Sequence, residues 1–446
     1  MDVHSTERLA RIKAQLEQAR RHDRDGRLVR AELLYAKLLP VWTENGWVAF
    51  RLAQLAVARN DTARAIRLLE SAIKLWPDEP QLGVELAVVH LMISEPALAI
   101  SVLESTLTGS PSFAAAWLLL GQVHDELGDS ANALKAWYQA VTRAQRAGQW
   151  RDEGSTPAPL LDSVVRAIES VRLGRRDLFF GAYDDVRQKF GEHELKRVDR
   201  AVSGFLRDWD ATPTDPRQRP RFLFFPDLPS SPYHDPYLQP WAARLKANFP
   251  LIRADAIRVV AEDRKLPNFV NLKAGDRLEN YVKGTGPQPS WEAFFFYRHG
   301  ERYDANHARC PNTSNALDAI ELCRISEHAP EICFSVLKPG SHILPHYGVT
   351  NTRLVMHLPL VVPPDCALNI VDVGEHHWEE GQLVMFDDTF AHEAWNRSDA
   401  TRIVLLMDCW NPHLTQVEKI AVKRLIETIG GLHLADKPRT KVDPAA

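Results

Sequence analysis

A 34-residue repeat runs through the first 145 residues and limits the possible folds more than any other feature of the chain. Alanine recurs at this interval at four places: Ala31, Ala65, Ala99 and Ala133. Leucines, small residues and turn-forming pairs follow the same step: Leu52, Leu86 and Leu120; Ala53, Ala87 and Gly121; Asn60-Asp61, Ser94-Glu95 and Gly128-Asp129. Small residues let two helices approach closely, so the period predicts helix pairs that stack on one another.

This pattern resembles the tetratricopeptide repeat, which forms an α-solenoid with a concave groove. The resemblance implies a groove that receives an extended peptide or protein, and the alternative is a scaffold for packing or dimerisation. Residues 155–210 also read as helices but show no clear repeat, and we expect them to cap the solenoid.

A proline-dense stretch at residues 211–240 is typical of a linker or domain boundary. We therefore predict three regions: tetratricopeptide-like repeats over residues 1–145, a helical cap and Pro-rich linker over residues 146–215, and a β-rich domain over residues 216–435.

Beyond the linker, short apolar runs alternate with turns. The runs are residues 291–297, 332–338, 353–362, 367–373, 382–388 and 402–410. Two helices are expected among them, at about 238–248 and 415–430. Short strands at this spacing predict an antiparallel barrel or a double-sheet jelly roll.

Composition excludes several classes of protein. The net charge is −4 and the pI is about 6.5, so there is no polybasic surface for nucleic acid or an anionic membrane. The N-terminus is charged and no apolar stretch is long enough to cross a bilayer, so we expect a cytoplasmic protein without membrane insertion. The five cysteines form no CxxC pair, which favours reduced thiols over disulfides or a zinc site.

Residues 339–357, "PGSHILPHYGVTNTRLVMH", place three histidines and an arginine in strand-like sequence. Downstream, His392 follows "FDDTFA" and Arg402 comes ten residues later. Two such histidines followed by an arginine match the order of ligands in iron(II)/2-oxoglutarate oxygenases. Imidazole suits iron(II), and the planar guanidinium suits the distal carboxylate of 2-oxoglutarate.

Residues 220–415 resemble the aspartyl/asparaginyl β-hydroxylase family. The likeness rests on "FSVLKPGSHILPHYGVTNTRLVMHLPL", "WEEGQLVMFDDTFAHEAW" and "DCWNP". It implies a double-stranded β-helix, or jelly roll, that binds Fe(II), 2-oxoglutarate and O2. It also implies that His346 and His392 are the metal ligands, and that Arg402 and Ser335 hold the distal carboxylate of 2-oxoglutarate.

The same resemblance assigns three further residues. His357 would lie at the cosubstrate end, Arg353 would face cosubstrate or substrate, and Trp291 would line the substrate channel. Gly348 replaces the carboxylate that most iron oxygenases place two residues after the first histidine, as it does in the β-hydroxylase family. Val355 departs from the family, which usually has a second arginine there, and this puts an aspartyl substrate in doubt.

Neighbouring carboxylates have less specific explanations. Asp387 and Asp388 are expected to fix the turn that aims His392. Glu393, next to that histidine, could support the metal site from behind.

The sequence therefore predicts a 2-oxoglutarate-dependent dioxygenase with His346, His392 and Arg402 as catalytic residues. It would hydroxylate an Asp/Asn-like side chain of a peptide or protein that the repeats select. Two alternatives remain: halogenation at the same iron, because Gly348 leaves room for a halide, and a tetratricopeptide scaffold with an inactive barrel.

Overall fold

The computed structural model describes residues 3–42, 44, 46–263, 265–270, 277–285 and 289–433. It divides into two compact units. The first holds the described residues up to Arg175, together with those from Leu432 onward, and the second is Arg176–Gly431.

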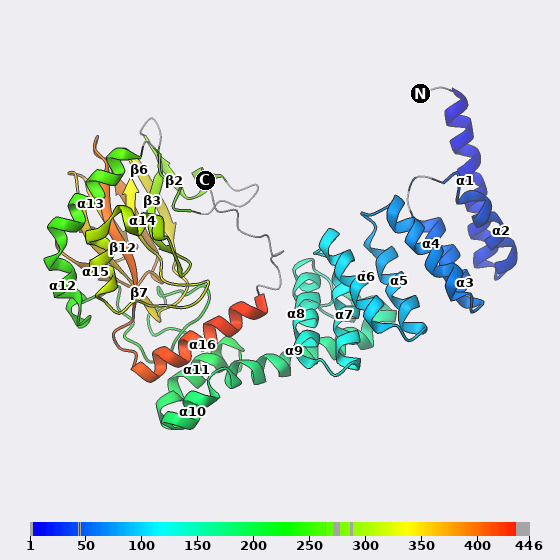
Figure 1. The fold of residues 1–446 in the computed structure, drawn as a ribbon, viewed down its shortest axis with the longest axis horizontal. Coiled ribbons are helices and arrows are strands. Elements are labelled where there is room, and N and C mark those ends of the chain that lie inside the picture. Colours follow the sequence, from blue (N-terminus) through cyan, green and yellow to red (C-terminus); the bar gives the residue numbers. More distant parts are fainter. Residues whose placement is uncertain are drawn as a thin grey trace. The chain divides into compact units, whose positions relative to one another are not determined.

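The first unit is helical. Its elements in chain order are α1 (Val3–Arg24), α2 (Leu28–Leu38), α3 (Trp47–Ala58), α4 (Thr62–Leu75), α5 (Pro80–Met92), α6 (Pro96–Gly109), α7 (Ala114–Glu126), α8 (Ser130–Arg146), the 3-10 turns η1 (Glu153–Ser155) and η2 (Ala158–Leu160), and α9 (Leu161–Gly181), which continues into the second unit. Successive helices follow one another as packed hairpins (Figure 1). A Cβ added at Gly121 would lie 2.3 Å from Cδ1 of Trp137, so only glycine permits this close approach of α7 and α8. The prediction of paired helices in a repeat is confirmed.

The second unit contains both helices and strands. Its helices are α10 (Asp184–Phe190), η3 (Glu192–Leu195), α11 (Lys196–Phe205), η4 (Pro236–Leu238), α12 (Ala242–Ala247), α13 (Phe249–Glu262), η5 (Leu278–Asn280), α14 (Asp304–Arg309), α15 (Pro311–Asp318) and α16 (Gln416–His433), whose last residues belong to the first unit. Its strands are β1 (Tyr233–His234), β2 (Val282–Gly284), β3 (Trp291–Arg298), β4 (Glu301–Arg302), β5 (Ile332–Leu337), β6 (Ser341–His346), β7 (Arg353–Val361), β8 (Cys366–Ile370), β9 (Gly374–His377), β10 (Val384–Phe386), β11 (His392–Asn396) and β12 (Arg402–Trp410).

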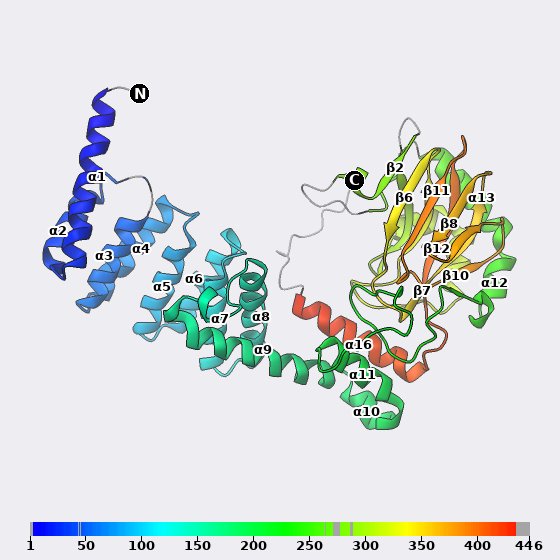
Figure 2. The same cartoon turned by 180° about the vertical axis from the view of Figure 1, so that it is seen from behind.

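In the described part of the chain these strands form two antiparallel sheets. The larger has the order β1-β10-β7-β12-β5-β3-β4, and the smaller has the order β2-β6-β11-β8-β9. Helices α12 and α13 flank the larger sheet (Figures 1 and 2). One apolar core lies between these helices and the larger sheet, and a second core draws side chains from both sheets.

The alternation of side chains along β7 decides which residues reach the space between the sheets. Leu354, Met356 and Leu358 belong to the helix-facing core. Val355 belongs to the core shared by the two sheets, and His357 has the same orientation by the two-residue period of a strand. The register therefore directs alternate residues of this strand at the candidate site.

Six strands lie where the apolar runs predict them: β3, β5, β7, β8, β10 and β12. The helix expected at 415–430 is α16, and the one expected at 238–248 is the shorter α12. The prediction missed α13, which follows directly and packs its buried Ile252, Ala256 and Val259 on the larger sheet.

The two compact units divide between Arg175 and Arg176, and the predicted boundaries near residues 145 and 215 stay predictions. Arg176 begins the unit that contains the sheets, so the helices α10 and α11 lie in that unit. Arg197, on α11, donates two hydrogen bonds to the Glu418 carboxylate of α16, which ties these helices together.

The proline-dense stretch is bound to the sheet domain and is not a free linker. Arg219 N–H donates to the Thr389 carbonyl, and Leu223 N–H donates to the Val349 carbonyl. Phe225 N–H donates to the Asn351 side chain at 2.8 Å. The prolines therefore shape an extended segment that runs along the loops next to His346 and His392.

Two composition-based observations can be compared with the structure. All five cysteines are buried and none forms a disulfide. No helix among the described residues has the length and apolarity needed to cross a membrane.

Candidate active site

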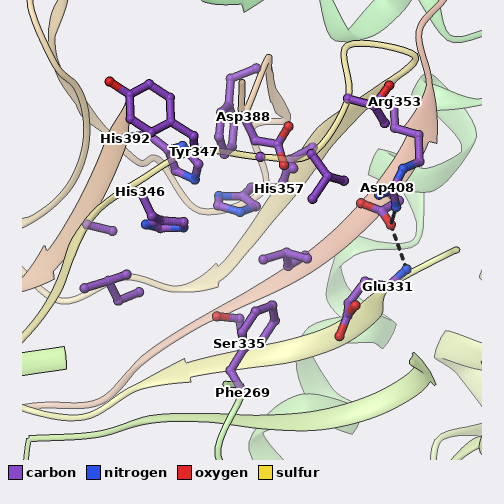
Figure 3. Close-up of a pocket in the computed structure, with 18 of the residues that line it drawn as sticks. Phe269, Glu331, Ser335, His346, Tyr347, Arg353, His357, Asp388, His392 and Asp408 are labelled. Carbon is purple, nitrogen blue, oxygen red and sulfur yellow. Dashed lines mark hydrogen bonds and ion pairs between the residues drawn. The ribbon is translucent and has the colours of Figure 1, made fainter. Parts of the chain in front are cut away.

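His346 and His392 lie close together because one ends a strand and the other begins the neighbouring strand of the same sheet. His346 is the last residue of β6, His392 is the first of β11, and the two are direct partners in the antiparallel register. Their ring centroids are 4.1 Å apart. Figure 3 shows both rings facing the same space, with His357 beside them.

Each ring is oriented by a hydrogen bond from its Nδ1 to the backbone carbonyl two residues before it. Nδ1–H of His346 donates to the Leu344 carbonyl at 2.8 Å, and Nδ1–H of His392 donates to the Phe390 carbonyl at 3.0 Å. In a neutral imidazole the other nitrogen then carries a free lone pair, which is the form that binds a metal. Burial lowers the pKa of both histidines, that of His392 to about 3, so both are neutral at physiological pH.

Arg402 lies beyond the histidines, at the start of β12, and is 2% exposed. Its Nη1 donates to the carbonyl and to Oγ of Ser335, both at 3.2 Å, and its Nε has no partner among the described residues. No carboxylate in the described part of the chain pairs with this guanidinium. Burial lowers its pKa to about 10, so the group remains a cation at neutral pH.

Ser335 links the arginine to Trp291. The indole Nε1–H of Trp291 donates to Oγ of Ser335 at 2.9 Å. Since this oxygen also accepts from Arg402, its two lone pairs are used and its own proton is free to be donated to a ligand. His357 is 6% exposed, and neither of its nitrogens has a partner among the described residues.

One cavity of about 530 Å³ collects these side chains. Six of the predicted site residues line it together with Arg353: His346, His392, Arg402, Ser335, His357 and Trp291. The rest of the wall is largely apolar and includes Phe222, Phe269, Val355 and Leu406. A site with two free imidazole nitrogens and a buried cation, enclosed by apolar walls, could hold a metal ion and an anionic ligand side by side.

The two aspartates before His392 have different positions. The Asp387 carboxylate accepts hydrogen bonds from the backbone and hydroxyl of Thr389 and from Gln218, so it fixes the turn as predicted. Asp388 instead faces the cavity, which the sequence prediction missed (Figure 3). Burial and the charge of Asp387 raise the pKa of Asp388 to about 8.

Asp388 fills the space beside Gly348. A Cβ at position 348 would lie 2.1 Å from both Cγ and Oδ1 of Asp388. The absence of a side chain at position 348 therefore makes room for a carboxylate that comes from the other histidine's loop.

We expect Gly348→Ala to destabilise the second unit by about 1–3 kcal/mol, because the new methyl group overpacks the Asp388 carboxylate. In an Asp388→Ala background the same change should cost much less, which a thermal-unfolding double-mutant cycle measures. Gly431→Ala is the matched control, because its Cβ would meet no atom within 4 Å. Additive effects of the two substitutions would contradict the contact.

Arg353 lines the cavity but its charge is already paired. Its Nη1 donates to Oδ2 of Asp408, which also accepts the backbone N–H of Glu331 at 2.8 Å. Burial raises the pKa of Glu331 to about 7. The end of the cavity near Arg353 is therefore polar and nearly charge-balanced. Asp408, which pairs with Arg353, follows Arg402 by six residues along β12.

Among the described residues, the hydrogen bonds of Glu393 go to neither His346 nor His392. Its carboxylate accepts from Nε2–H of His342 at 2.7 Å and from Nδ2–H of Asn369 at 2.8 Å. His342 lies on β6 and Asn369 on β8, and neither lines the cavity, although Glu393 does. Among the described residues, no group of three or more His, Cys, Asp or Glu side chains is arranged to hold a metal ion.

Comparisons with known proteins agree with both halves of the sequence interpretation. Residues 246–412 match the family model described as Aspartyl/Asparaginyl beta-hydroxylase, and residues 50–112 and 94–148 match the tetratricopeptide repeat.

Three relatives are similar to the same part of the chain. The Ornithine lipid ester-linked acyl 2-hydroxylase of Rhizobium tropici is 35% identical over 192 residues, which is 43% of this chain and 64% of the relative. The Aspartate beta-hydroxylase domain-containing protein 2 of Mus musculus is 31% identical over 209 residues, 46% of this chain and 58% of the relative. The Aspartyl/asparaginyl beta-hydroxylase of Homo sapiens is 32% identical over 181 residues, 39% of this chain and 22% of the relative.

The chain thus spans less than two thirds of the length of each of these relatives. The matched region contains both histidines and Arg402, and the repeats precede it. Residues 246–412 are therefore a domain of the aspartyl/asparaginyl β-hydroxylase family, in a chain that also carries tetratricopeptide repeats.

Proposed function

We propose that this chain is an Fe(II)- and 2-oxoglutarate-dependent hydroxylase whose two sheets form the double-stranded β-helix of such enzymes. The observation that carries the proposal is the buried Arg402 guanidinium, which has no carboxylate partner among the described residues. Burying a cation without an anion costs several kcal/mol, so the site favours an anionic ligand at this position.

The donors around Arg402 suit the distal carboxylate of 2-oxoglutarate. Arg402 and the free proton of Ser335 would bind the two oxygens of this carboxylate, and His357 offers an unpartnered nitrogen nearby. The keto-acid end of the molecule would then reach the two imidazoles across the same cavity.

His346 and His392 would hold the iron through their Nε2 atoms. Bound together, iron and 2-oxoglutarate supply the dioxygen chemistry that hydroxylates a carbon atom. The residues of the chain orient the reactants: the backbone carbonyls of Leu344 and Phe390 fix the rings, and Phe269, stacked on Trp291 at 3.9 Å, keeps water away from one wall.

We propose a peptide or protein side chain, presented by the tetratricopeptide repeats, as the substrate. Val355 lines the cavity where the family resemblance would place an arginine. Arg353 is already paired with Asp408. Among the described residues that line the cavity, Arg402 is thus the one arginine or lysine without a carboxylate partner. This favours an asparaginyl or other uncharged side chain over an aspartyl one.

A second candidate substrate is an acyl chain. The apolar wall formed by Phe222, Ile343, Val355 and Leu406 favours it, and the relative from Rhizobium tropici is named for acyl hydroxylation. The reaction would be the same, and only the group that enters the cavity would differ.

One experiment separates these possibilities. The His346→Ala protein serves as a trap for partners from an extract, and wild-type protein with Fe(II) and 2-oxoglutarate is then added to the captured material. The proposal expects succinate release and a mass gain of one oxygen atom on a captured peptide or lipid. Chloride incorporation would support halogenation instead, and no succinate with any captured partner would favour an inactive barrel.

A further inference from the structure

Trp378 is the first residue of the "WEEG" motif and is not among the residues predicted to form the site. It follows β9 directly, is 5% exposed, and belongs to the core shared by the two sheets. Cζ of Arg402 lies 5.0 Å from the centroid of its ring. The indole is therefore stacked against the one guanidinium of the cavity that has no carboxylate partner among the described residues.

Trp378 also contacts His357, the other side chain at this end of the cavity that lacks a hydrogen-bond partner among the described residues. Its ring centroid is 5.8 Å from that of His357, and its own Nε1 has no hydrogen-bond partner among the described residues. Arg402 and His357 line the cavity, whereas Trp378 does not. The indole therefore lies behind the two ligand-facing groups and can act on a ligand only through them.

The aromatic face of Trp378 can stabilise the buried Arg402 cation without neutralising its charge. A carboxylate partner would stabilise buried Arg402 but would also neutralise the charge that an anionic ligand needs. An indole stabilises the cation by about 2 kcal/mol when the pair is desolvated, without neutralising it. The indole at this distance also limits the movement of the guanidinium, and hence the direction of its N–H donors.

We propose that Trp378 is a positioning residue that holds Arg402 at the depth required by a five-carbon keto dicarboxylate. This inference rests on the proposed function, because it takes 2-oxoglutarate as the ligand of Arg402. Without the indole, the guanidinium can retreat into the vacated space. The cavity then binds 2-oxoglutarate more weakly and discriminates less against a longer dicarboxylate.

The test uses the full chain with Trp378→Leu and Trp378→Phe. Calorimetry with Zn(II), which has no redox chemistry, measures binding of 2-oxoglutarate and of the one-carbon-longer 2-oxoadipate. We expect Trp378→Leu to raise the dissociation constant for 2-oxoglutarate roughly 30-fold, and Trp378→Phe to raise it less, because it keeps an aromatic face. The preference for 2-oxoglutarate over 2-oxoadipate, roughly 10- to 200-fold for one methylene, should shrink in the leucine variant.

Trp395→Leu is the matched control. Trp395 is 6% exposed and lies 4.3 Å from Cζ of Arg397, a similar stack that does not line this cavity. Its replacement should leave both dissociation constants unchanged.

Steady-state kinetics add a readout that a merely structural role would not move. The KM for 2-oxoglutarate should rise while kcat at saturation stays within about twofold, because the indole does not touch the reacting atoms. If the leucine variant does not fold, the phenylalanine variant decides: a several-fold weaker affinity supports the inference, and an unchanged affinity overturns it.

Unchanged affinity and unchanged length preference in a folded Trp378→Leu protein would overturn the inference while leaving the proposed function intact. Failure of the wild-type protein to bind 2-oxoglutarate with metal would instead overturn the proposed function. The two failures are therefore distinguishable in the same experiment.

Discussion

Replacing His346 or His392 with alanine is expected to abolish turnover and to weaken metal binding by well over 100-fold, while the protein stays folded. Loss of an outer partner of a metal ligand already costs roughly 10- to 100-fold, and each of these histidines would be one of only two ligands from the chain. Both rings are neutral, and their Nδ1 atoms bond to carbonyls two residues back. Among the described residues, their removal therefore breaks no hydrogen bond to a distant part of the chain.

The matched control is His342→Ala. His342 lies on the same strand as His346, but it does not line the cavity and its ring bonds to Glu393. We expect its replacement to leave metal binding and turnover nearly unchanged. Metal content after dialysis, circular dichroism and succinate release measure the three variants side by side. Turnover near the wild-type level by either cavity variant, at equal iron loading, would refute the assignment of the metal site.

The strands of the second unit were largely predictable because their apolar runs are short and bounded by turns. The strands β5, β7 and β12 begin within one residue of the predicted runs. Helix α13 was missed, although its buried residues Ile252, Ala256 and Val259 recur at helical spacing and its proline stands in the first turn, where a helix tolerates it.

The contacts of the proline-dense stretch could not be predicted from the sequence. Proline excludes helix and central strand, so composition favours a linker, but it does not reveal which surface the extended chain lies on. Here Gln218, Leu223 and Phe225 bond to loops more than 100 residues away. Phe222 consequently reaches the cavity, a contact that no local pattern encodes.

The residues of the candidate site were predictable where the family motif has a single characteristic residue at a given position. His346, His392, Arg402, Ser335 and His357 do share one cavity. Their assignment to metal and cosubstrate remains a prediction.

Different roles for adjacent residues of the same type could not be predicted from the sequence. Asp387 and Asp388 look equivalent in sequence, yet the turn directs one at Gln218 and the other at the cavity. Trp378 lies 24 positions before Arg402, and its contact with the guanidinium exists only once the sheets have closed around both.

The second large effect concerns Arg402. We expect Arg402→Lys to raise the KM for 2-oxoglutarate roughly 10- to 100-fold, because lysine keeps the charge but loses the planar pair of donors, and a hydrogen bond to a charged group contributes about 1.5–3 kcal/mol. Chemistry at saturating 2-oxoglutarate should be largely retained. Arg397→Lys, at the exposed arginine that stacks on Trp395, is the control and should leave the KM unchanged. An unchanged KM in Arg402→Lys would mean that this arginine does not anchor the cosubstrate.

Replacing Arg402 with methionine distinguishes a ligand anchor from a structural arginine. Removal of an arginine that belongs to a buried ion pair destabilises a protein by about 3–5 kcal/mol, since it leaves an uncompensated carboxylate. Arg402 leaves none among the described residues, and its pKa is held near 10, below its ordinary value, so its charge costs stability at every pH below about 10. Arg402→Met should therefore melt at the same or a higher temperature than the wild type without ligand. The wild type, but not the variant, should gain stability when 2-oxoglutarate and Zn(II) are added, by about 2.7 kcal/mol at a hundred times the dissociation constant. A large loss of stability in the ligand-free variant would show instead that Arg402 supports the sheet and not a bound anion.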